Sequence, residues 1–521
     1  MAKSRSTGVS RRTMLAGMSA AAAAALVGSA GEANAAVRTR YDIKTPQGRV
    51  ALDNYREAVG KMQLLDESNP LSWKYQANIH AHPYSQDQAR AVFASAPPDA
   101  LKLALGPDGD GAGGIWWTCT HHQAPDGSTI DGDYFTAWHR LYLWHFERIC
   151  EKVLGRPFAL PYWNYLDLTQ LKPPQGILAG KLKVNGRIVD NALFYKDRSP
   201  DFVRDGLRAI RGDDSNTDIL AKDSMKSKSF FNLSTSNGSN RAGFVSNIDG
   251  TPHGSVHVRV GAFDSEGKPI GMESFEEAAR DPIFWLHHAN IDRLWESWRT
   301  PLPNGASSRD PKAPKASVWL NRSFTFADVS GHPSAKTARD SLSLPGLGYR
   351  YDRLQPIGLI AFAAPNAEQT VVKVTTVCQT AAGSAAVVGA GNAPVVLSLA
   401  PTLPSDQATK LARDAGNQFW LVIDVETSKN PGSLFAVTVK AKRSVGSTAM
   451  VDAPVQTFNL FNAGMHERHG LSYSTAWQVD ISDLVRASRV DLTKAVEVTV
   501  KPIAGNASGI VKVKGMRVEA Q

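Results

Sequence analysis

The stretch DPIFWLHHANIDRLW, residues 281–295, places two adjacent histidines inside an apolar segment rich in aromatic residues. Because a buried imidazole costs free energy unless its nitrogens find partners, this pair requires either a hydrogen-bond network or a metal ion. A second pair, His253 and His257, has the i, i+4 spacing that puts both imidazoles on one face of a helix, where they can hold one ion. Neighbours on a helix point about 100° apart, so only one of His287 and His288 is expected to join that ion.

More histidines occur in three earlier pieces of the chain: IHAHPY with His80 and His82, CTHH with His121 and His122, and WHRLYLWH with His139 and His145. One histidine from each piece gives a second site made of three imidazoles. Nitrogen ligation without a nearby carboxylate or thiolate pair suits copper better than magnesium, calcium or a structural zinc. The sequence therefore predicts two metal sites and favours copper in both.

Six motifs together resemble those of the type-3 dicopper family of tyrosinases, catechol oxidases and molluscan haemocyanin units. They are IHAHPY, CTH, TAWHRLYLWHFE, LPYWNY, PHGSVH and DPIFWLHHANIDRLW, and they fall between residues 50 and 300. The resemblance implies two copper ions, the first held by His80, His121 and His139 and the second by His253, His257 and His288. It also implies a thioether bond from Cys119 to the ring of His121, which would lock that imidazole's orientation.

Two of these assignments have rivals in the sequence. IHAH replaces the commoner IHG of the family, which leaves His82 as an alternative to His80. The insertion QAPDGSTIDGD lengthens the gap that precedes His139, which leaves His122 as an alternative to His121, although the Cys-x-His spacing favours His121.

The resemblance implies a reaction in which dioxygen oxidises an o-diphenol to an o-quinone, with a small phenol and O2 as the partners. Phe275 matches the family position of a phenylalanine that overhangs the second copper and stacks on the substrate ring. Relatives that hydroxylate monophenols well often have an asparagine directly after the first ligand of the second copper, and a nearby glutamate. Together these two side chains hold a water that deprotonates the phenol. Gly254 and Asp249 stand at those places here, which predicts weak or absent monophenol hydroxylation.

The alternatives are a tyrosinase with full monophenolase activity and an o-aminophenol oxidase. An oxygen carrier or a non-catalytic zinc protein is less favoured. Asp292, four residues after His288, has two readings as well. It either orients a ligand imidazole or forms a salt bridge with a basic side chain such as Arg293.

The N-terminus has the three parts of an export signal. Arg11 and Arg12 precede an apolar, alanine-rich run, and the small-residue site ANA ends at residue 35. Residues 1–35 are therefore expected to be a twin-arginine signal peptide, which implies a periplasmic or secreted protein. No later stretch is long and apolar enough to span a bilayer. Three cysteines are too few for a disulfide scaffold.

The composition indicates a globular chain of more than one domain. Of the 521 residues, 42% are hydrophobic and 21% charged, and the net charge of +9 is spread out without the basic, aromatic-rich runs that bind nucleic acid. Residues 36–355 are expected to form a mainly α dicopper domain, a four-helix bundle with long loops. The composition predicts no oligomeric state.

After residue 365, stretches such as QFWLVIDVET and LFAVTVKAK alternate apolar and polar residues. They predict an antiparallel β-sandwich or jelly-roll domain over residues 366–521. YRYD, residues 349–352, resembles the paired-tyrosine motif that closes the catalytic domain in the family. The C-terminal domain resembles one that covers the active site in latent plant-type enzymes. If it does so here, one of its residues plugs the substrate entrance.

Overall fold

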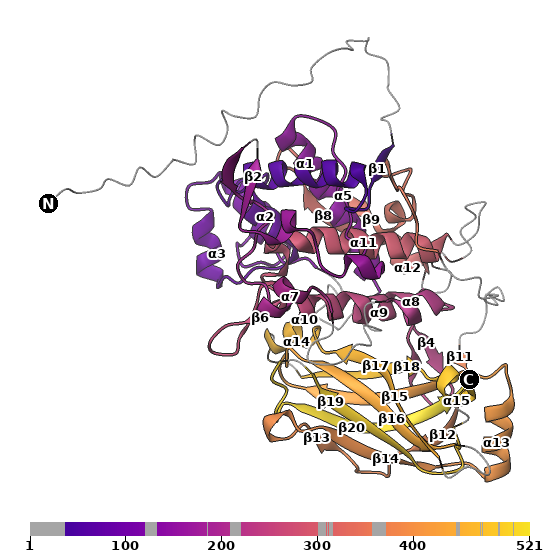
Figure 1. Ribbon diagram of the computed structural model, residues 1–521. Coiled ribbons are helices and arrows are strands. Elements are labelled where there is room, and N and C mark those ends of the chain that lie inside the picture. The colour runs from indigo at the N-terminus through magenta and orange to yellow at the C-terminus, as the bar shows by residue number, and fades with distance from the viewer. Residues whose placement is uncertain are drawn as a thin grey trace.

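The computed structural model describes residues 37–119, 133–184, 186–208, 220–300, 309, 311, 316–356, 371–443, 449–468, 470, 472–487, 490–503 and 505–521. His121, His122 and the signal peptide expected at residues 1–35 lie outside this part of the chain. Figure 1 shows a helical domain, up to residue 356, beside a sheet domain that begins at residue 371. The predicted order, helices first and antiparallel strands after residue 365, is confirmed.

Four helices frame the helical domain: α1 (Pro46–Met62), α2 (Trp73–His80), α5 (Phe135–Leu154) and α11 (Pro282–Arg299). α5 packs against both α1 and α11. Gly155 ends α5 in the left-handed conformation, φ 70°, that favours glycine. Asp281 caps α11 by accepting a hydrogen bond from the backbone N–H of Ile283, at 2.9 Å. Arg198 donates two further hydrogen bonds to the same carboxylate and so fixes the start of α11. The four-helix bundle as such stays a prediction.

Short elements joined by long loops make up the rest of the helical domain. They are β1 (Arg38–Arg40), α3 (Gln86–Val92), α4 (Pro98–Leu105), η2 (Leu168–Gln170), α6 (Gln175–Leu178), β2 (Lys181–Val184), β3 (Arg187–Asp190), α7 (Pro200–Asp205), α8 (Lys222–Lys226), β4 (Leu233–Thr235), β5 (Asn240–Arg241), α9 (Phe244–Ile248), η4 (Asp249–Gly254), α10 (Ser255–Val260), β6 (Ala262–Phe263), β7 (Pro269–Ile270), η5 (Gly271–Glu273), η6 (Ala278–Arg280), α12 (Ala316–Asn321), β8 (Ser323–Ala327), β9 (Pro333–Thr337), η7 (Ala338–Leu342) and β10 (Tyr349–Tyr351). β1 pairs in parallel with β10, which brings the two ends of this domain together.

The sheet domain contains β11 (Val371–Val372), β12 (Thr375–Gln379), β13 (Ala386–Val387), η8 (Ala390–Asn392), β14 (Val395–Pro401), α13 (Ser405–Arg413), β15 (Phe419–Thr427), β16 (Leu434–Lys442), β17 (Met450–Asn459), α14 (Ala463–Arg468), β18 (Tyr473–Asp480), α15 (Ser482–Ala487), β19 (Val496–Pro502) and β20 (Val511–Ala520). The strand order is β17-β16-β19-β14-β12-β20-β15-β18, with β13 beside β20, and every pairing in this sheet is antiparallel. Apolar side chains from β12, β15, β16, β19 and β20 share one core. The sandwich or jelly-roll topology stays a prediction.

The two domains are joined by a buried contact and by strand pairing. Arg241 of β5 donates to Glu519 of β20 at 2.9 Å, and its guanidinium lies over the ring of Trp420. β11 pairs in parallel with β4 of the helical domain. Leu434 and Phe461, from the sheet domain, belong to the hydrophobic core of the helical domain. Among the described residues, no helix is both long and apolar enough to cross a membrane.

Candidate metal centre

Five helical elements bring six of the predicted histidines into the middle of the helical domain. Each of the six is at most 2% exposed: His80 ends α2, His139 lies in α5, His253 lies in η4, His257 lies in α10, and His287 and His288 lie in α11. The site is therefore formed by residues far apart in the sequence and is held by rigid elements rather than by loops.

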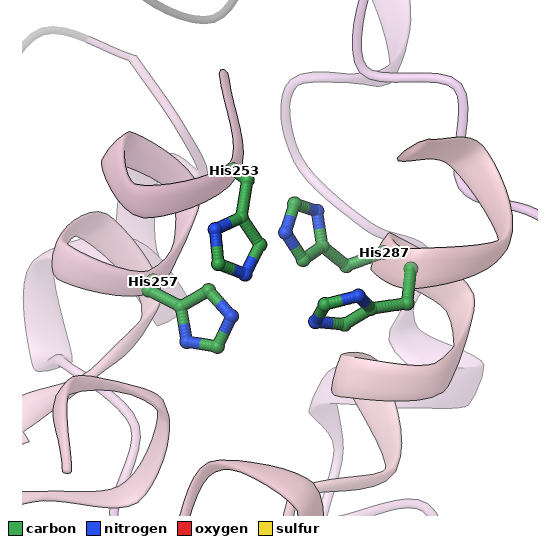
Figure 2. Close-up of side chains that lie close together, drawn as sticks. His253, His257 and His287 are labelled. Carbon is green, nitrogen blue, oxygen red and sulfur yellow. The ribbon is translucent and has the colours of Figure 1, made fainter. Parts of the chain in front are cut away.

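The histidines fall into two groups, numbered after the two predicted metal sites. The second group consists of His253, His257, His287 and His288, each of which offers a ring nitrogen within 4.8 Å of the others. Figure 2 shows His253 and His257 extending toward His287 on the facing helix. The rings of His253 and His257 lie 4.5 Å apart, as the i, i+4 spacing predicts. The segment is not one regular α-helix, because η4 is a π-helical segment directly before α10.

Both histidines of the doublet reach this second group, whereas the sequence predicted only one. The ring of His288 lies 5.0 Å from that of His253, and the ring of His287 lies 5.6 Å from it. The Cα–Cβ bonds of the two residues diverge, but an imidazole extends far enough from the helix for two consecutive rings to meet at one point. Nδ1 of His287 lies 3.1 Å from the hydroxyl of Tyr165, which leaves its Nε2 on the side of the group.

A first group brings together His80, Cys119 and His139. The Sγ atom of Cys119 lies 3.7 Å from Nε2 of His139. Its predicted partner His121 lies outside the described residues, so the thioether bond stays a prediction. His82 is not in this group; its Nδ1 accepts a hydrogen bond from the backbone N–H of Tyr84 at 3.3 Å. The geometry therefore favours His80 over His82.

The two groups adjoin each other in apolar surroundings. The rings of His139 and His288, one from each group, stack at 4.3 Å with an interplanar angle of 11°. Phe284 lies against both groups, 4.1 Å from the ring of His288 and 5.1 Å from that of His80. Phe135 lies 4.7 Å from the ring of His139. The aromatic side chains that surround the doublet in the sequence thus keep water away from the imidazoles.

Backbone carbonyls hold three of the imidazoles in a fixed orientation. Nδ1 of His139 lies 2.8 Å from the carbonyl of Phe135, and Nδ1 of His257 lies 2.7 Å from that of Met272. Nδ1 of His253 lies 3.0 Å from the carbonyl of Asp249. A carbonyl oxygen only accepts, so each Nδ1 carries the proton and each Nε2 keeps a lone pair for a metal.

The other nitrogens and the charge state fit a metal as well. Nε2 of His257, Nε2 of His287 and both ring nitrogens of His288 have no hydrogen-bond partner among the described residues, although all are buried. Burial lowers the pKa of His80 to about 3 and holds the pKa values of His139, His257, His287 and His288 well below the usual range. Neutral imidazoles with unsatisfied nitrogens are the donor set that copper prefers.

Asp292 does not orient His288. It accepts hydrogen bonds from Arg40 and Tyr349, at 2.9 and 2.7 Å, and from Arg140 and Tyr351. The salt-bridge alternative is correct, but the partners are Arg40 and Arg140 rather than Arg293. The paired tyrosines of YRYD thus close the domain by binding a buried carboxylate that also forms ion pairs with two buried guanidinium groups.

Phe275 lies beside the first group, and its predicted place over the second metal stays a prediction. Its ring is 4.6 Å from the ring of His80, so it borders the first group, whereas the sequence placed it over the second metal. The loop that carries Phe275 joins η5 to η6, and η6 packs on α2, which ends at His80. This packing draws the phenylalanine toward the first group.

Asp249 and Gly254 both lie beside His253 and both contact the sheet domain. Oδ1 of Asp249 is 3.2 Å from Nδ1 of His253, and its Oδ2 accepts a hydrogen bond from Asn462 at 3.0 Å. Gly254 is buried beneath Asn459. The second group is therefore in contact with a loop that lies some two hundred residues later in the chain.

Phe461, in this loop, is a residue beside the second group that the sequence does not reveal. It is 1% exposed, and its ring stacks on that of His257 at 4.3 Å and meets that of His253 edge-on at 5.9 Å. It also lies 6.3 Å from Phe275. Nothing local in the sequence marks it, because its role depends on how two domains dock.

Comparisons with known proteins agree with this site. Residues 70–301 match the model of the common central domain of tyrosinase. A tyrosinase of Hahella sp. is 26% identical over 457 residues, which are 84% of this chain and 88% of that protein. A chloroplastic polyphenol oxidase of Spinacia oleracea is 30% identical over 327 residues, but these cover 58% of this chain and only 45% of that protein.

Solved structures are similar in fold over nearly the whole chain. A latent aurone synthase aligns with a TM-score of 0.57 at 18% identity and covers 93% of this chain and 90% of its own. A latent apple tyrosinase aligns with a TM-score of 0.56 at 21% identity and covers 93% of this chain and 97% of its own. The helical domain followed by an antiparallel sheet domain is thus a known arrangement.

Proposed function

Because this chain belongs to the tyrosinase and polyphenol oxidase family of binuclear copper oxidoreductases that act on phenols, we propose that it oxidises o-diphenols to o-quinones with O2 and hydroxylates monophenols weakly or not at all. The observation that carries the proposal is the pair of adjoining groups of buried, neutral imidazoles, in which His139 stacks on His288.

The proposed ligands are those that the family resemblance implies. His80, His139 and, from outside the described residues, His121 would hold one copper, and His253, His257 and His288 would hold the other. When bound, the copper pair supplies the transfer of two electrons from each diphenol to dioxygen. His287 would support the second site from its hydrogen bond to Tyr165.

The chain's own residues orient the ligands and exclude water. The carbonyls of Phe135, Asp249 and Met272 fix three imidazoles with Nε2 toward the centre. Phe284 fills the space beside the histidines, and Phe275 borders the route by which an aromatic substrate would approach. A fixed, dry site needs little reorganisation when the substrate binds.

The weak monophenolase activity that we propose follows from the surroundings of His253. Gly254 has no side chain with which to hold a water molecule. The carboxylate of Asp249 already accepts from Asn462 and lies 3.2 Å from His253. Asp249 is also one methylene shorter than the glutamate of relatives that hydroxylate monophenols well, so it is expected to hold a proton-accepting water less effectively.

Oxygen uptake by the copper-loaded, full-length chain tests this proposal, with a matched o-diphenol, monophenol and o-aminophenol as substrates. We expect uptake with the diphenol and little with the monophenol. Comparable uptake with both would make the chain a full tyrosinase and contradict the argument from Gly254. A clear preference for the aminophenol would make it an o-aminophenol oxidase. Uptake with none of the three, by the full-length chain and by a Phe461→Ala chain alike, would favour oxygen carriage.

We further propose that the sheet domain keeps the enzyme latent, because Phe461 lies where an aromatic substrate would stack on His257. Phe461 is part of the helical domain's own core, and Asn459 and Asn462 bind Gly250 and Asp249 on either side of it. Activation then requires the loop to move away or to be removed.

Substitution of Phe461 by alanine is expected to raise diphenol oxidation by the full-length chain. Loss of a buried phenylalanine contact weakens docking by about 2 kcal/mol, and each 1.4 kcal/mol is about tenfold in an equilibrium, so activity should rise at least about tenfold. Initial rates of oxygen uptake measure this. Phe461→Leu is the control, since it keeps an apolar plug and should stay mostly latent. Equal rates for Phe461→Ala and wild type would contradict the proposal that Phe461 blocks the substrate's place on His257.

Docking of the sheet domain is expected to weaken as the pH rises. Burial and the facing carboxylate of Asp480 raise the pKa of Asp223 to about 7, with Lys226 and Lys222 acting in the opposite direction. Burial raises the pKa of Glu273, which accepts from Asn430 at 3.0 Å, to about 8. In the docked state both carboxyls are therefore protonated at acidic pH and resist ionisation as the pH rises. The contribution of the two carboxyls to docking is complete below the ordinary carboxyl pKa. It is lost as the pH rises through their raised pKa values of about 7 and about 8.

The basal rate of the full-length chain, relative to that of Phe461→Ala, should therefore increase between pH 5 and pH 8 (roughly the span between the ordinary and the raised pKa values). Asp223→Asn cannot ionise and should flatten part of this increase. A constant ratio over this range would show that docking does not depend on these carboxyls.

We also propose export by the twin-arginine route, from the signal at residues 1–35. Retention of an Arg11→Lys, Arg12→Lys variant in the cytoplasm would support this proposal, and unchanged export would contradict it.

A further inference from the structure

Gly254 is a glycine in a place where the backbone does not require one. Its φ and ψ, −60° and −34°, are those of an ordinary right-handed helix, and it lies between His253 and the first residue of α10. In such a conformation glycine is less favourable than alanine by about 1 kcal/mol. The reason for a glycine must therefore lie in what surrounds its Cα atom.

The surrounding group is the side-chain amide of Asn459, from the sheet domain. A Cβ atom placed on Gly254 would lie 2.4 Å from Oδ1 of Asn459 and 3.0 Å from its Cγ and Nδ2. A carbon atom does not approach oxygen this closely without displacing it. Any side chain at position 254 would therefore push Asn459 out of its place.

Asn459 is not free to give way. Its Nδ2 donates to the carbonyl of Gly250 at 2.8 Å and to the hydroxyl of Ser255 at 3.2 Å. Its Oδ1 accepts from the backbone N–H of Phe461 at 3.1 Å. A shift of the amide would break hydrogen bonds on both sides of the domain interface.

The same amide also sets the direction of the plug. The hydrogen bond from the N–H of Phe461 to the side chain of Asn459 closes a turn over two residues, the kind of turn that asparagine forms with its own backbone. Phe461 leaves this turn and stacks on His257. The position of the plug thus depends on the position of the amide.

We propose that Gly254 is the seat of the sheet domain: its missing side chain admits the carboxamide of Asn459, which in turn aims Phe461 at His257. This inference rests on the proposed latency and names the contact that determines it. Its consequence is that a side chain at position 254 and the closed state exclude one another. The residue next to His253 therefore sets whether the chain closes, besides any part it has in substrate choice.

Hydrogen exchange of the copper-free, full-length chain tests the seat without any enzymatic reaction. In Gly254→Ala, peptides that contain Phe461 should exchange at least about tenfold faster than in wild type, because the closed state is lost. Peptides of α5 and α11, and of the sheet core, should keep wild-type protection, which shows that both domains are folded.

Gly250→Ala is the matched control. It is the same substitution in the same helical segment, and a Cβ atom there meets nothing within 4 Å. Exchange at Phe461 should stay as in wild type. If Gly254→Ala also leaves exchange unchanged, or if both alanine variants raise it equally, the proposed role of Gly254 in docking the sheet domain is wrong.

Asn459→Gly provides an independent test should Gly254→Ala disturb the helical domain itself. It removes the amide from the other side, and we expect the same loss of protection at Phe461 with an intact helical domain. In the Asn459→Gly background, the further change Gly254→Ala should have no additional effect, since the atoms that clash are gone. Additive effects would overturn the proposed contact. Because none of these measurements needs copper or substrate, their outcome is separate from that of the oxidase assay.

Discussion

Replacement of His288 by alanine is expected to reduce the copper content from two ions per chain to one and to abolish phenol oxidation. Both ring nitrogens of His288 are buried without a partner among the described residues, and its ring joins the second group to the first by stacking on His139. The loss of activity should exceed the roughly 10- to 100-fold that removal of an outer hydrogen-bond partner causes. Copper analysis and oxygen uptake on one preparation measure both effects.

Two further histidine variants give this result its meaning. His145→Ala removes a buried imidazole that stacks on Phe326 away from both groups, so copper content and activity should stay near wild type. His287→Ala should retain two ions and lose activity within roughly 10- to 100-fold, as expected of a supporting residue. If His287→Ala loses the ion and His288→Ala keeps it, the roles of the two histidines are reversed.

Local spacing was sufficient to predict much of this centre. The i, i+4 spacing of His253 and His257 places both rings together because a helical segment does form there. The helix that carries His139 could be predicted from its apolar period and the glycine at its end, whereas the choice of His139 itself came from the resemblance of its WHR motif to the family. The alternation of apolar and polar residues after residue 365 likewise indicates strands without any knowledge of their partners.

Contacts between distant segments could not be predicted in the same way. The rule that helix neighbours diverge describes backbone directions, and it does not exclude that His287 and His288 converge on one point. Phe275 borders the first group because of how its loop packs on another element. The role of Phe461 exists only once the two domains dock. Such contacts depend on tertiary packing, which no short window of sequence specifies.

The partners of Asp292 belong to the same class, and they lead to the second large effect that we expect. Arg40 donates to it from β1, Arg140 from α5, and Tyr349 and Tyr351 from β10. Both guanidinium groups are fully buried, and Arg40 also binds Glu147 through two hydrogen bonds of 2.9 Å. One carboxylate thus joins the first strand, two long helices and the last strand of the helical domain.

Asp292→Ala is expected to lower the free energy of unfolding by about 3–5 kcal/mol, because it removes the carboxylate that two buried guanidinium groups share and leaves them with one carboxylate each, Glu147 for Arg40 and Glu296 for Arg140. Denaturant unfolding followed by tryptophan fluorescence measures the change. Asp201→Ala is the control, since it breaks an ion pair with Arg204 in which both side chains are more than half exposed, and it should cost at most about 1 kcal/mol. A similar, small loss for both variants would show that the buried network is not stabilising.

The pH dependence of this network supplies a further test of the same carboxylate. Burial alone would raise the pKa of Asp292, but the charges of Arg140 and Arg40 outweigh it and hold the pKa below its ordinary value. A carboxyl with a lowered pKa stabilises the fold above the pKa that it has in the unfolded chain, and this contribution is lost as the pH falls further. The difference in stability between wild type and Asp292→Ala should therefore be constant near neutral pH and shrink in acid.

Docking of the sheet domain is expected to change in the opposite direction, since Asp223 and Glu273 favour the closed state when protonated. Acid should thus loosen the helical domain while it holds the sheet domain in place, and the two effects can be separated by their opposite dependence on pH.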